Sequence, residues 1–358
     1  MTGLAKARQG PHCDELGVEF LQPTSQGIGE APILRVSDLR IVFRTRETTI
    51  HAVNGISFEL LPGELLAVVG ESGSGKSVTM MSLMKLLPSP PAEIVSGRVR
   101  LGDRDLLSLH ASEMGKIRGN EVGFIFQDPM TSLNPVLTVG YQLMEPLRKH
   151  LGLSRGQARE RALELLSLVG IPSPQERIND YPHQFSGGMR QRVMIAIALA
   201  CDPKLLIADE PTTALDVTIQ AQILELVKKL RWEIGMSIIW ITHDLGVVAG
   251  IADRVMVMYA GLVVECATVD DLYSDPRHPY TRALLETLPR PNQGGEERLK
   301  SVLGQPPHLT AFPTGCPFAP RCPHVFDRCR VERPPLMPVR EGHEAACWRD
   351  VTEQSPHV

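Results

Sequence analysis

One eight-residue segment, GESGSGKS at 70–77, constrains the fold of this chain more than any other, because it fits the pattern G-x-x-x-x-G-K-S in full. The apolar residues 65–69 precede it and predict a short strand buried on both faces. A helix is expected to follow the segment and to end before Pro88. A glycine-rich turn between a buried strand and a helix is the context of a P-loop, which binds nucleotide phosphates in α/β proteins.

The residue types of this loop fit the phosphates of a nucleotide. Gly73 and Gly75 let backbone N–H groups wrap around the β-phosphate. Lys76 reaches the β- and γ-phosphates, and the Ser77 hydroxyl is a ligand for Mg²⁺. The alternative is an ordinary glycine-rich turn, which the strand and helix on either side disfavour. The predicted nucleotide contacts in and beside the loop are Gly70, Ser72, Gly73, Ser74, Gly75, Lys76, Ser77 and Val78.

Polar side chains follow two further strands that are predicted to be buried. Asp209 ends the apolar strand expected at 204–208, where an open α/β sheet places its ligands, and its carboxylate suits Mg²⁺. Glu210 comes next and is a candidate for polarising the water that attacks the γ-phosphate. His243 follows the strand expected at 237–242 and is placed to contact the γ-phosphate, with a purely structural histidine as the alternative. We therefore predict Glu210 and His243 as the catalytic residues.

The composition of the 358 residues limits the classes of function. The formal net charge of −4 gives no reason to expect nucleic-acid binding through bulk electrostatics. No apolar run reaches the roughly 18–20 residues of a membrane-spanning helix, and the polar N-terminus lacks the apolar core of a signal peptide. We expect a cytosolic protein whose contact with a membrane goes through a partner.

The order of the predicted elements indicates an α/β fold with an insertion and an extension. Residues 1–30 are polar and read as a disordered tail, and 31–270 form the main domain. Within that domain, residues from about 130 to 195 are mostly helical and interrupt the strands, which predicts an inserted helical subdomain. In residues 271–358, Pro, Cys, Arg and His are frequent and periodicity is weak, which predicts a small, loop-rich C-terminal extension.

Six motifs occur in the order found in ABC-transporter ATPases. They are the P-loop at 70–77, Gln127, SGG at 186–188, LLIADE at 205–210, ALD at 214–216 and THD at 242–244. The chain therefore resembles an ATP-binding subunit of an ABC transporter over about residues 33–265. The resemblance implies a P-loop NTPase fold of the α/β class, with a mixed core sheet, an antiparallel β subdomain and an inserted helical subdomain.

The second glycine motif acquires a role from this resemblance. Ser186, Gly187 and Gly188 open a helix whose N-terminus attracts anions, although the chain already has one phosphate-binding loop. The resemblance implies a head-to-tail dimer, in which this turn closes on nucleotide at the P-loop of a second ATPase and Asp216 communicates across the dimer. Met189 replaces the glutamine that usually ends this motif, so we expect the phosphate contact to remain and contact with the partner's ribose or loop to weaken.

The resemblance also adds two residues to the nucleotide site. Gln127 is expected to join Ser77 and Asp209 around Mg²⁺ and to signal to membrane subunits. Phe43 matches the position of an aromatic residue that stacks on adenine in the family, with an ordinary core residue as the alternative. ATP and Mg²⁺ are thus the expected nucleotide and cation.

Four clustered cysteines mark the C-terminal extension, namely Cys316, Cys322, Cys329 and Cys347. In a reducing compartment such a cluster suggests a metal site before disulfides, and the paired C-x2-C knuckles of zinc ribbons are missing. Thiolates on proline-rich loops suit a [4Fe–4S] cluster, with Zn²⁺ as the alternative. The segments 275–285 and 315–323 resemble the C-terminal extension of oligopeptide and dipeptide importer ATPases, some of which carry such a cluster.

The resemblance implies one main function and leaves two alternatives. We expect an ATP-hydrolysing subunit that energises peptide import, bound peripherally to the cytoplasmic face of the inner membrane. Its expected partners are two integral membrane permeases, a second ATPase (a paralogue or a copy) and an extracytoplasmic substrate-binding protein, without nucleic acid. One alternative is the ATPase of an importer for nickel or another small solute, and the other is a soluble ABC ATPase that acts on nucleic acid.

Overall fold

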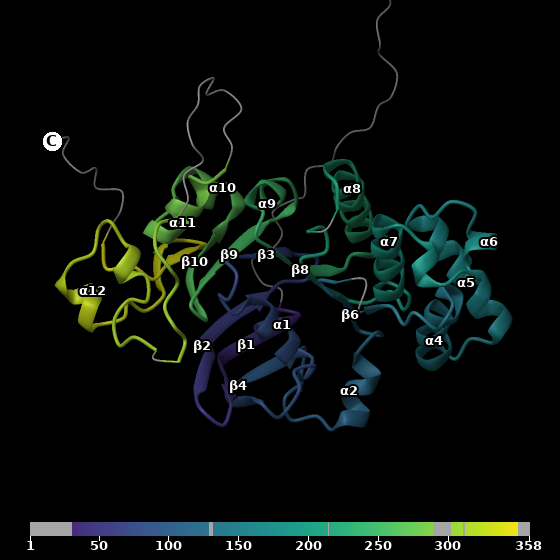
Figure 1. The fold of residues 1–358 in the computed structure, drawn as a ribbon, viewed down its shortest axis with the longest axis horizontal. Coiled ribbons are helices and arrows are strands. Elements are labelled where there is room, and N and C mark those ends of the chain that lie inside the picture. The colour runs from purple at the N-terminus through teal and green to yellow at the C-terminus, as the bar shows by residue number, and fades with distance from the viewer. Residues whose placement is uncertain (1–30, 129–131, 214, 289–301, 311, 350–358) are drawn as a thin grey trace, which may run out of the picture. The chain divides into compact units, whose positions relative to one another are not determined.

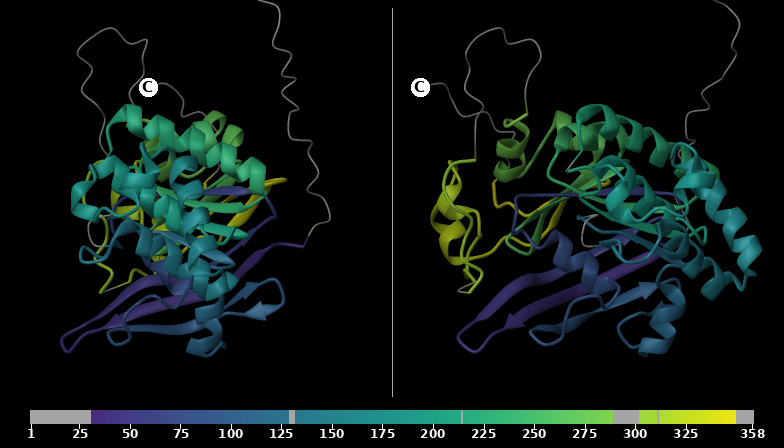
Figure 2. Two further views of the ribbon diagram at one scale, coloured as in Figure 1. Left: turned by 90° about the vertical axis from the view of Figure 1, so that its right-hand side faces the viewer. Right: turned by 45° about the vertical axis from the view of Figure 1, so that its right-hand side comes forward.

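Two sheets and a layer of helices form the part of the chain that the computed structural model describes, which is residues 31–128, 132–213, 215–288, 302–310 and 312–349 (Figure 1). The tail predicted at 1–30 lies outside the described residues. The larger sheet has eight strands and the smaller one has four. The smaller sheet lies along one face of the larger sheet, and the longer helices cover the other face (Figure 2).

The larger sheet runs in the order β11-β12-β10-β9-β3-β8-β7-β6. Its parallel part consists of β9 (Arg254–Tyr259), β3 (Leu65–Val69), β8 (Ser237–Thr242), β7 (Leu205–Asp209) and β6 (Val122–Ile125). Every residue of β3, β7 and β8 is buried, which explains their nearly unbroken apolar sequences. Antiparallel strands complete the sheet beyond β9, so the mixed sheet predicted from the sequence is confirmed; they are β10 (Leu262–Thr268), β12 (His343–Ala345) and β11 (Met337–Arg340).

The smaller sheet is antiparallel and runs in the order β2-β1-β4-β5. Its strands are β1 (Leu34–Arg44), β2 (Thr49–Leu60), β4 (Ala92–Leu101) and β5 (Arg104–Asp105). Helix α1 (Lys76–Leu83) packs in the core that the two sheets share, because its Met80 is fully buried together with Leu66 of β3 and Ile41 of β1. Helix α2 (Ala111–Ile117) contributes Met114 to the same core.

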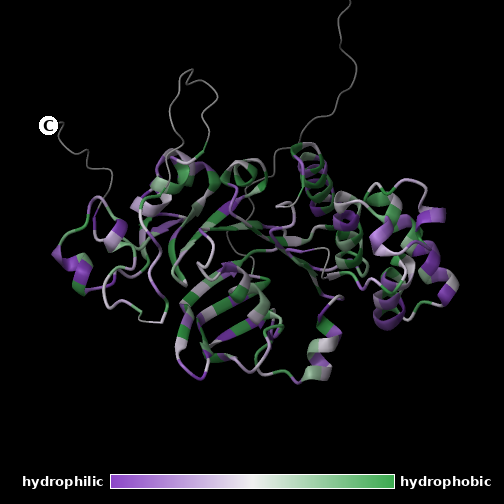
Figure 3. Cartoon of the chain, viewed as in Figure 1, coloured by the Kyte–Doolittle hydropathy of each residue, from purple (hydrophilic) through white to green (hydrophobic). Residues whose placement is uncertain are grey.

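The longer helices lie on the opposite face of the larger sheet. Helices α7 (Gly187–Ala198), α8 (Val217–Ile234) and α9 (Leu245–Ile251) bury apolar residues against it. Helices α4 (Val139–Leu151) and α5 (Arg155–Leu168) pack on each other and on α7. The short helices α6 (Pro174–Arg177) and η1 (Pro182–Gln184) lie in the connection from α5 to α7. Hydrophilic residues colour much of this helical group, whereas the strands of the sheet are mainly hydrophobic (Figure 3).

The segment after β10 begins with two helices, α10 (Val269–Ser274) and α11 (Pro279–Leu285). It then runs mainly as loops with η2 (Ala319–Arg321), α12 (Asp327–Val331) and the β11–β12 hairpin. Fully buried Glu265 of β10 ties these parts together, because it accepts hydrogen bonds from the backbone N–H groups of Arg277 and His278 and contacts His343 Nε2 at 2.8 Å. No helix in the described ranges is long and apolar enough to span a bilayer.

Candidate functional site

The P-loop connects β3 to α1, as its sequence predicts. Gly70 and Gly75 have φ angles of 151° and 96°, in the region that favours glycine. A Cβ atom at Gly70 would collide with the backbone carbonyl of Met258, and one at Gly75 would lie 2.6 Å from the carbonyl oxygen of Ala52. The loop therefore needs glycine at both positions, because β9 and β2 press against its backbone.

Lys76, the first residue of α1, folds back over the P-loop. Its Nζ donates hydrogen bonds to the backbone oxygens of Gly70 and Glu71, at 2.7 and 3.0 Å. The side chain is 5% exposed, and burial lowers the pKa of its ammonium group, while the carboxylates of Glu210 and Asp209 act in the opposite direction. The P-loop thus holds the Lys76 ammonium group beside the carboxylates of Asp209 and Glu210, at the end of β7.

Ser77 and Asp209 form the oxygen pair that the sequence predicts for Mg²⁺. Ser77 Oγ donates a hydrogen bond of 2.9 Å to Asp209 Oδ1. Asp209 is buried at the end of β7, and that burial raises the pKa of its carboxyl group, although the bond from Ser77 lowers it. Two adjacent hard oxygen donors fit a Mg²⁺ ion. Gln127, the third predicted ligand, contacts Glu210 instead.

Glu210 lies at the centre of the predicted catalytic residues. Its Oε2 accepts hydrogen bonds from Gln127 Nε2 at 3.1 Å and from Thr213 Oγ1 at 3.0 Å, and lies 3.4 Å from His243 Nδ1. The parallel pairing of β7 with β8 brings Glu210 and His243 together, because each residue follows the end of its strand. Glu210 also has a φ of 46°, and its N–H donates to the carbonyl oxygen of Ile241 at 3.0 Å. Strained backbone of this kind is frequent at active sites.

The second glycine motif and Asp216 are helix caps on the helical side of the molecule. Ser186 Oγ accepts a hydrogen bond from the N–H of Met189 at 3.3 Å and caps α7. Asp216 caps α8 by accepting from the N–H of Ile219 at 2.9 Å. The two caps are neighbours, since a Cβ at Gly188 would lie 3.1 Å from Ile219, whereas one at Gly187 would meet open space. In the described part of the chain, no hydrogen bond connects these caps with the P-loop.

The remaining predicted nucleotide contacts lie around the P-loop and β1. Phe43 is half-buried in β1 and packs on the core between the two sheets, which is also where Val78 of α1 packs. Ser72 and Gly73 are exposed at the tip of the loop. The carbonyl oxygen of Ser74 accepts a hydrogen bond of 3.0 Å from the N–H of Gly261. The stacking role of Phe43 stays a prediction.

The four cysteines of the extension carry free, partly buried thiols. Burial, with a smaller contribution from the thiols of the other three cysteines, raises the pKa of Cys316 to about 11, so the four lie near one another; they are Cys316, Cys322, Cys329 and Cys347. Within the described ranges, no group of three or more His, Cys, Asp or Glu side chains is arranged to hold a single metal ion. The described residues therefore show no site for a single metal ion at these cysteines, and the [4Fe–4S] cluster stays a prediction.

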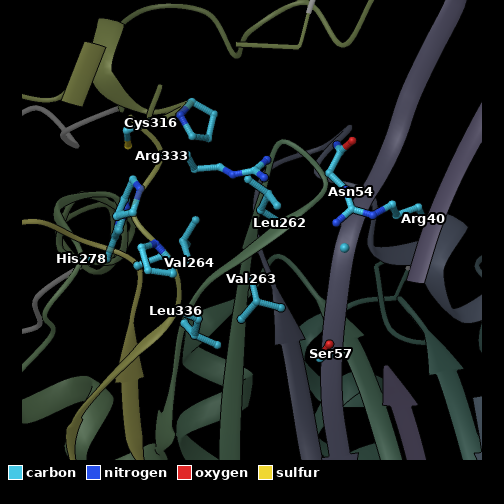
Figure 4. A pocket seen from close by; sticks show the side chains of 15 residues that line it. Arg40, Asn54, Ser57, Leu262, Val263, Val264, His278, Cys316, Arg333 and Leu336 are labelled. Carbon is cyan, nitrogen blue, oxygen red and sulfur yellow. The ribbon is translucent and has the colours of Figure 1, made fainter. Parts of the chain in front are cut away.

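A cavity of about 280 Å³ separates the smaller sheet from the extension (Figure 4). Arg40 and Asn54 line it from the smaller sheet, Val263 from β10, and Cys316 and Arg333 from the extension. None of the P-loop residues lines it, so we do not assign the nucleotide to this cavity.

Three further residues at the P-loop are absent from the sequence prediction. The carboxylate of Glu71 pairs with the guanidinium of Arg321, and its N–H donates to Tyr280 Oη at 2.8 Å. The motif includes Glu71 only as a variable position, and its two partners lie more than 200 residues away in the chain. No local signal in the sequence therefore reveals this contact.

Comparison with known proteins identifies relatives of both parts of the chain. Residues 53–213 match a family model described as ABC transporter, and 264–329 match one described as oligopeptide/dipeptide transporter, C-terminal region. The chain is 55% identical to the oligopeptide transport ATP-binding protein OppD of Bacillus subtilis, over 88% of each chain. It is 53% identical to the dipeptide transport ATP-binding protein DppD of the same organism, over 88% of this chain and 94% of the relative.

A solved structure agrees with the fold described above. The post-hydrolysis dimer of the ATP-binding cassette MJ0796, bound to ADP and Pi, superposes with a TM-score of 0.60 at 32% identity. The match covers 66% of this chain and 98% of that one. The fold predicted from the sequence, an α/β cassette with mixed and antiparallel sheets, is thereby confirmed.

Proposed function

The chain belongs to the ABC transporter family, and from that membership we propose that it hydrolyses ATP to energise the import of peptides across a membrane. The observation that carries the proposal is the meeting of Lys76, the Ser77–Asp209 pair and the Glu210–His243 pair at the ends of β3, β7 and β8. The match of 264–329 to the C-terminal region of oligopeptide/dipeptide transporters supports peptides as the cargo.

Residues of the P-loop and residues at the ends of β7 and β8 have separate roles in phosphoryl transfer. Backbone N–H groups of residues 70–77 and the Lys76 ammonium bind the β- and γ-phosphates. Ser77 and Asp209 hold Mg²⁺, which when bound neutralises negative charge on the phosphates. Glu210 polarises the attacking water through its carboxylate, and His243 donates a hydrogen bond to the γ-phosphate.

Glu210 uses one of its two carboxylate oxygens to contact its neighbours. In this structure its Oε2 already accepts from Gln127 and Thr213, so that oxygen is occupied. As a ligand of Mg²⁺ beside Ser77 and Asp209, Gln127 would no longer donate to Glu210 Oε2, which would leave that oxygen to the attacking water. The contact between Gln127 and Glu210 fits the predicted role of Gln127 in signalling to membrane subunits.

A second ATPase completes each nucleotide site in the proposed assembly. The cap formed by Ser186, Gly187 and Gly188, of which the first two residues are exposed, presents a hydroxyl and free N–H groups to the γ-phosphate at the P-loop of the partner. Asp216 lies beside this cap and contacts the same partner. The solved relative MJ0796 is dimeric, which supports this arrangement.

The four cysteines are proposed to hold a [4Fe–4S] cluster that staples the loops of the extension. A single Zn²⁺ ion needs all its thiolates about 2.3 Å away, and no such group of three side chains exists among the described residues, which include all four cysteines. Four Cys thiolates are the usual ligand set of a [4Fe–4S] cluster, and these four cysteines would supply it. This assignment is tested by iron and sulfide analysis of the purified protein. The double variant Cys322→Ser and Cys347→Ser serves as the form without a cluster. Bound zinc in the unchanged protein contradicts the assignment.

The proposed partners follow from the transporter family. Two permease subunits cross the membrane, a paralogous or identical ATPase completes the dimer, and a binding protein outside the cell delivers the peptide. The chain itself sits peripherally on the cytoplasmic face of the inner membrane.

Glu210→Gln tests the proposed chemistry in the assembled transporter. The neutral amide keeps the shape of the side chain and cannot polarise water, so we expect ATP binding to persist and hydrolysis to fall by roughly 10²–10⁴-fold. ATP affinity and phosphate release are measured on the same preparation. Glu164→Gln, an exposed change on α5, is the matched control and should leave both unchanged. Normal hydrolysis by Glu210→Gln would contradict the assignment.

A further inference from the structure

The C-terminal extension reaches the nucleotide site through one buried arginine. Arg321 ends η2, next to Cys322, and its side chain is only 3% exposed. Its Nη1 and Nη2 atoms donate to the two carboxylate oxygens of Glu71, at 2.7 and 2.9 Å. Glu71 is the second residue of the P-loop, so a bidentate ion pair joins the extension to the loop that binds phosphates.

Arg321 is held in place by contacts that do not involve Glu71. Its Nε and Nη2 donate to the carbonyl oxygens of Leu303 and Val302, at 2.9 and 3.0 Å, and Nη1 donates to Tyr259 Oη at 3.2 Å. The guanidinium also lies over the rings of Tyr259 and Phe318. Contacts from the extension and from Tyr259 of β9 therefore hold the guanidinium beside Glu71.

A second contact from the extension fixes the backbone at the same residue. The N–H of Glu71 donates to Tyr280 Oη at 2.8 Å, and Tyr280 is fully buried against Tyr259 and Phe318. The carbonyl of Glu71 accepts from Lys76. Side chain, N–H and carbonyl of this one residue are thus all engaged, two of them by the extension.

We propose that Arg321 is a positioning residue for ATP binding, which neutralises Glu71 and holds the P-loop in its phosphate-binding shape from the C-terminal extension. The proposal rests on the assignment of 70–77 as the ATP-binding loop. A carboxylate in that loop opposes a polyanionic ligand unless a cation pairs with it. Arg321 supplies that cation, and its bidentate geometry fixes the side chain direction in a way that a lysine cannot.

Arg321→Gln is the first test, made in the full-length chain and in the assembled transporter. We expect the Kd and KM for ATP to rise roughly tenfold, while kcat changes little, because the variant loses uniform binding of substrate and transition state. Arg328→Gln, an exposed arginine of the same extension paired with Glu332, is the matched control and should behave like the unchanged protein.

The decisive measurement is rescue by a second change at the P-loop. If Arg321 acts by neutralising Glu71, then Glu71→Gln added to Arg321→Gln removes the unpaired charge and returns ATP affinity most of the way to its original value. If Arg321 had only a structural role, the second change would not restore ATP affinity. A double variant that binds ATP as weakly as Arg321→Gln therefore overturns the proposal. Arg321→Lys keeps the charge, so its ATP affinity should lie between that of Arg321→Gln and that of the unchanged chain. Thermal unfolding verifies that each variant is folded.

Hydrogen exchange gives an independent readout of the coupling. Linkage is reciprocal, so ATP should slow amide exchange at residues 315–323 in the unchanged chain and not in Arg321→Gln. Equal effects of ATP in both proteins contradict the proposal. An unchanged chain that fails to bind ATP would instead refute the proposed function, so the two failures are distinguishable.

Discussion

His278 is fully buried, and its ring is held as a neutral acceptor. It caps α11, where Nδ1 accepts a hydrogen bond of 3.0 Å from the N–H of Tyr280. Burial lowers the pKa of this imidazole to about 4, and the carboxylate of Glu265 opposes that shift only in part. The fold of the extension therefore depends on a histidine that stays unprotonated.

That pKa predicts a specific loss of stability in acid. Between the ordinary pKa of 6.5 and the folded value of about 4, the unfolded chain binds a proton at His278 that the folded chain does not, so the free energy of unfolding falls as pH decreases through this window. His278→Asn keeps a cap acceptor and removes the titration. Melting temperatures measured from pH 7 to pH 4.5 should fall less steeply for the variant; parallel curves contradict the prediction.

Some residues of the nucleotide site can be predicted from the sequence around them, and others cannot. Lys76, Asp209 and Glu210 stand in short motifs beside buried strands, so local sequence predicts both their positions and their convergence at one sheet edge. Gln127 is also found there, although its amide contacts Glu210 instead of the Ser77–Asp209 pair. The pairing of Glu71 with Arg321 depends on how the extension folds back, which no local pattern encodes.

The elements follow their sequence patterns closely where burial is complete. Strands β3 and β8 have the predicted bounds, because every residue of both strands is buried and their sequences are apolar or nearly so. Helix α1 ends at Leu83, short of the end predicted near Pro88, since Met84 already leaves the helical conformation and Lys85 has a φ of 50°. The prediction omitted β4, half of whose residues are exposed, so that the strand lacks a clear apolar pattern.

Helix caps give a test at the scale of elements. Ser186 and Ser154 each cap an α-helix by accepting from a backbone N–H three residues later, so each serine→alanine change should cost about 1 kcal/mol of stability. Only Ser186→Ala should also lower ATP hydrolysis in the assembled transporter, because its hydroxyl is the proposed contact to the partner's γ-phosphate. Thermal unfolding and phosphate release are compared for both variants; equal hydrolysis contradicts the trans-site role.

At the scale of the whole molecule, the extension is joined to the core by shared sheet structure. The β11–β12 hairpin pairs with β10 and covers its outer edge. The extension is loop-rich, as the sequence predicts, but its two short strands carry too little pattern for sequence alone to place them on the main sheet. The boundary at 270 stays a prediction.

Removal of the hairpin should therefore affect the core. A chain that ends at residue 333 loses β11 and β12, leaves the edge of β10 unpaired and removes His343 from buried Glu265, and it also loses Cys347 of the proposed cluster. We expect a lower melting temperature and concentration-dependent association, measured by calorimetry and light scattering. A chain that ends at residue 349, and so keeps all the described residues of the extension, is the control. A monomeric, equally stable product of the longer deletion contradicts the prediction.

The ion pair between Glu71 and Arg321 also sets an order of events during synthesis. The two residues are 250 positions apart in the chain, so at ~5–20 residues per second a ribosome needs about 12–50 s to make the arginine after the loop. Through that interval the nascent cassette has its phosphate-binding motif and lacks the cation that neutralises it. On the proposal that Arg321 positions Glu71, strong ATP binding should therefore begin only after the C-terminal extension has been made and has folded against the P-loop.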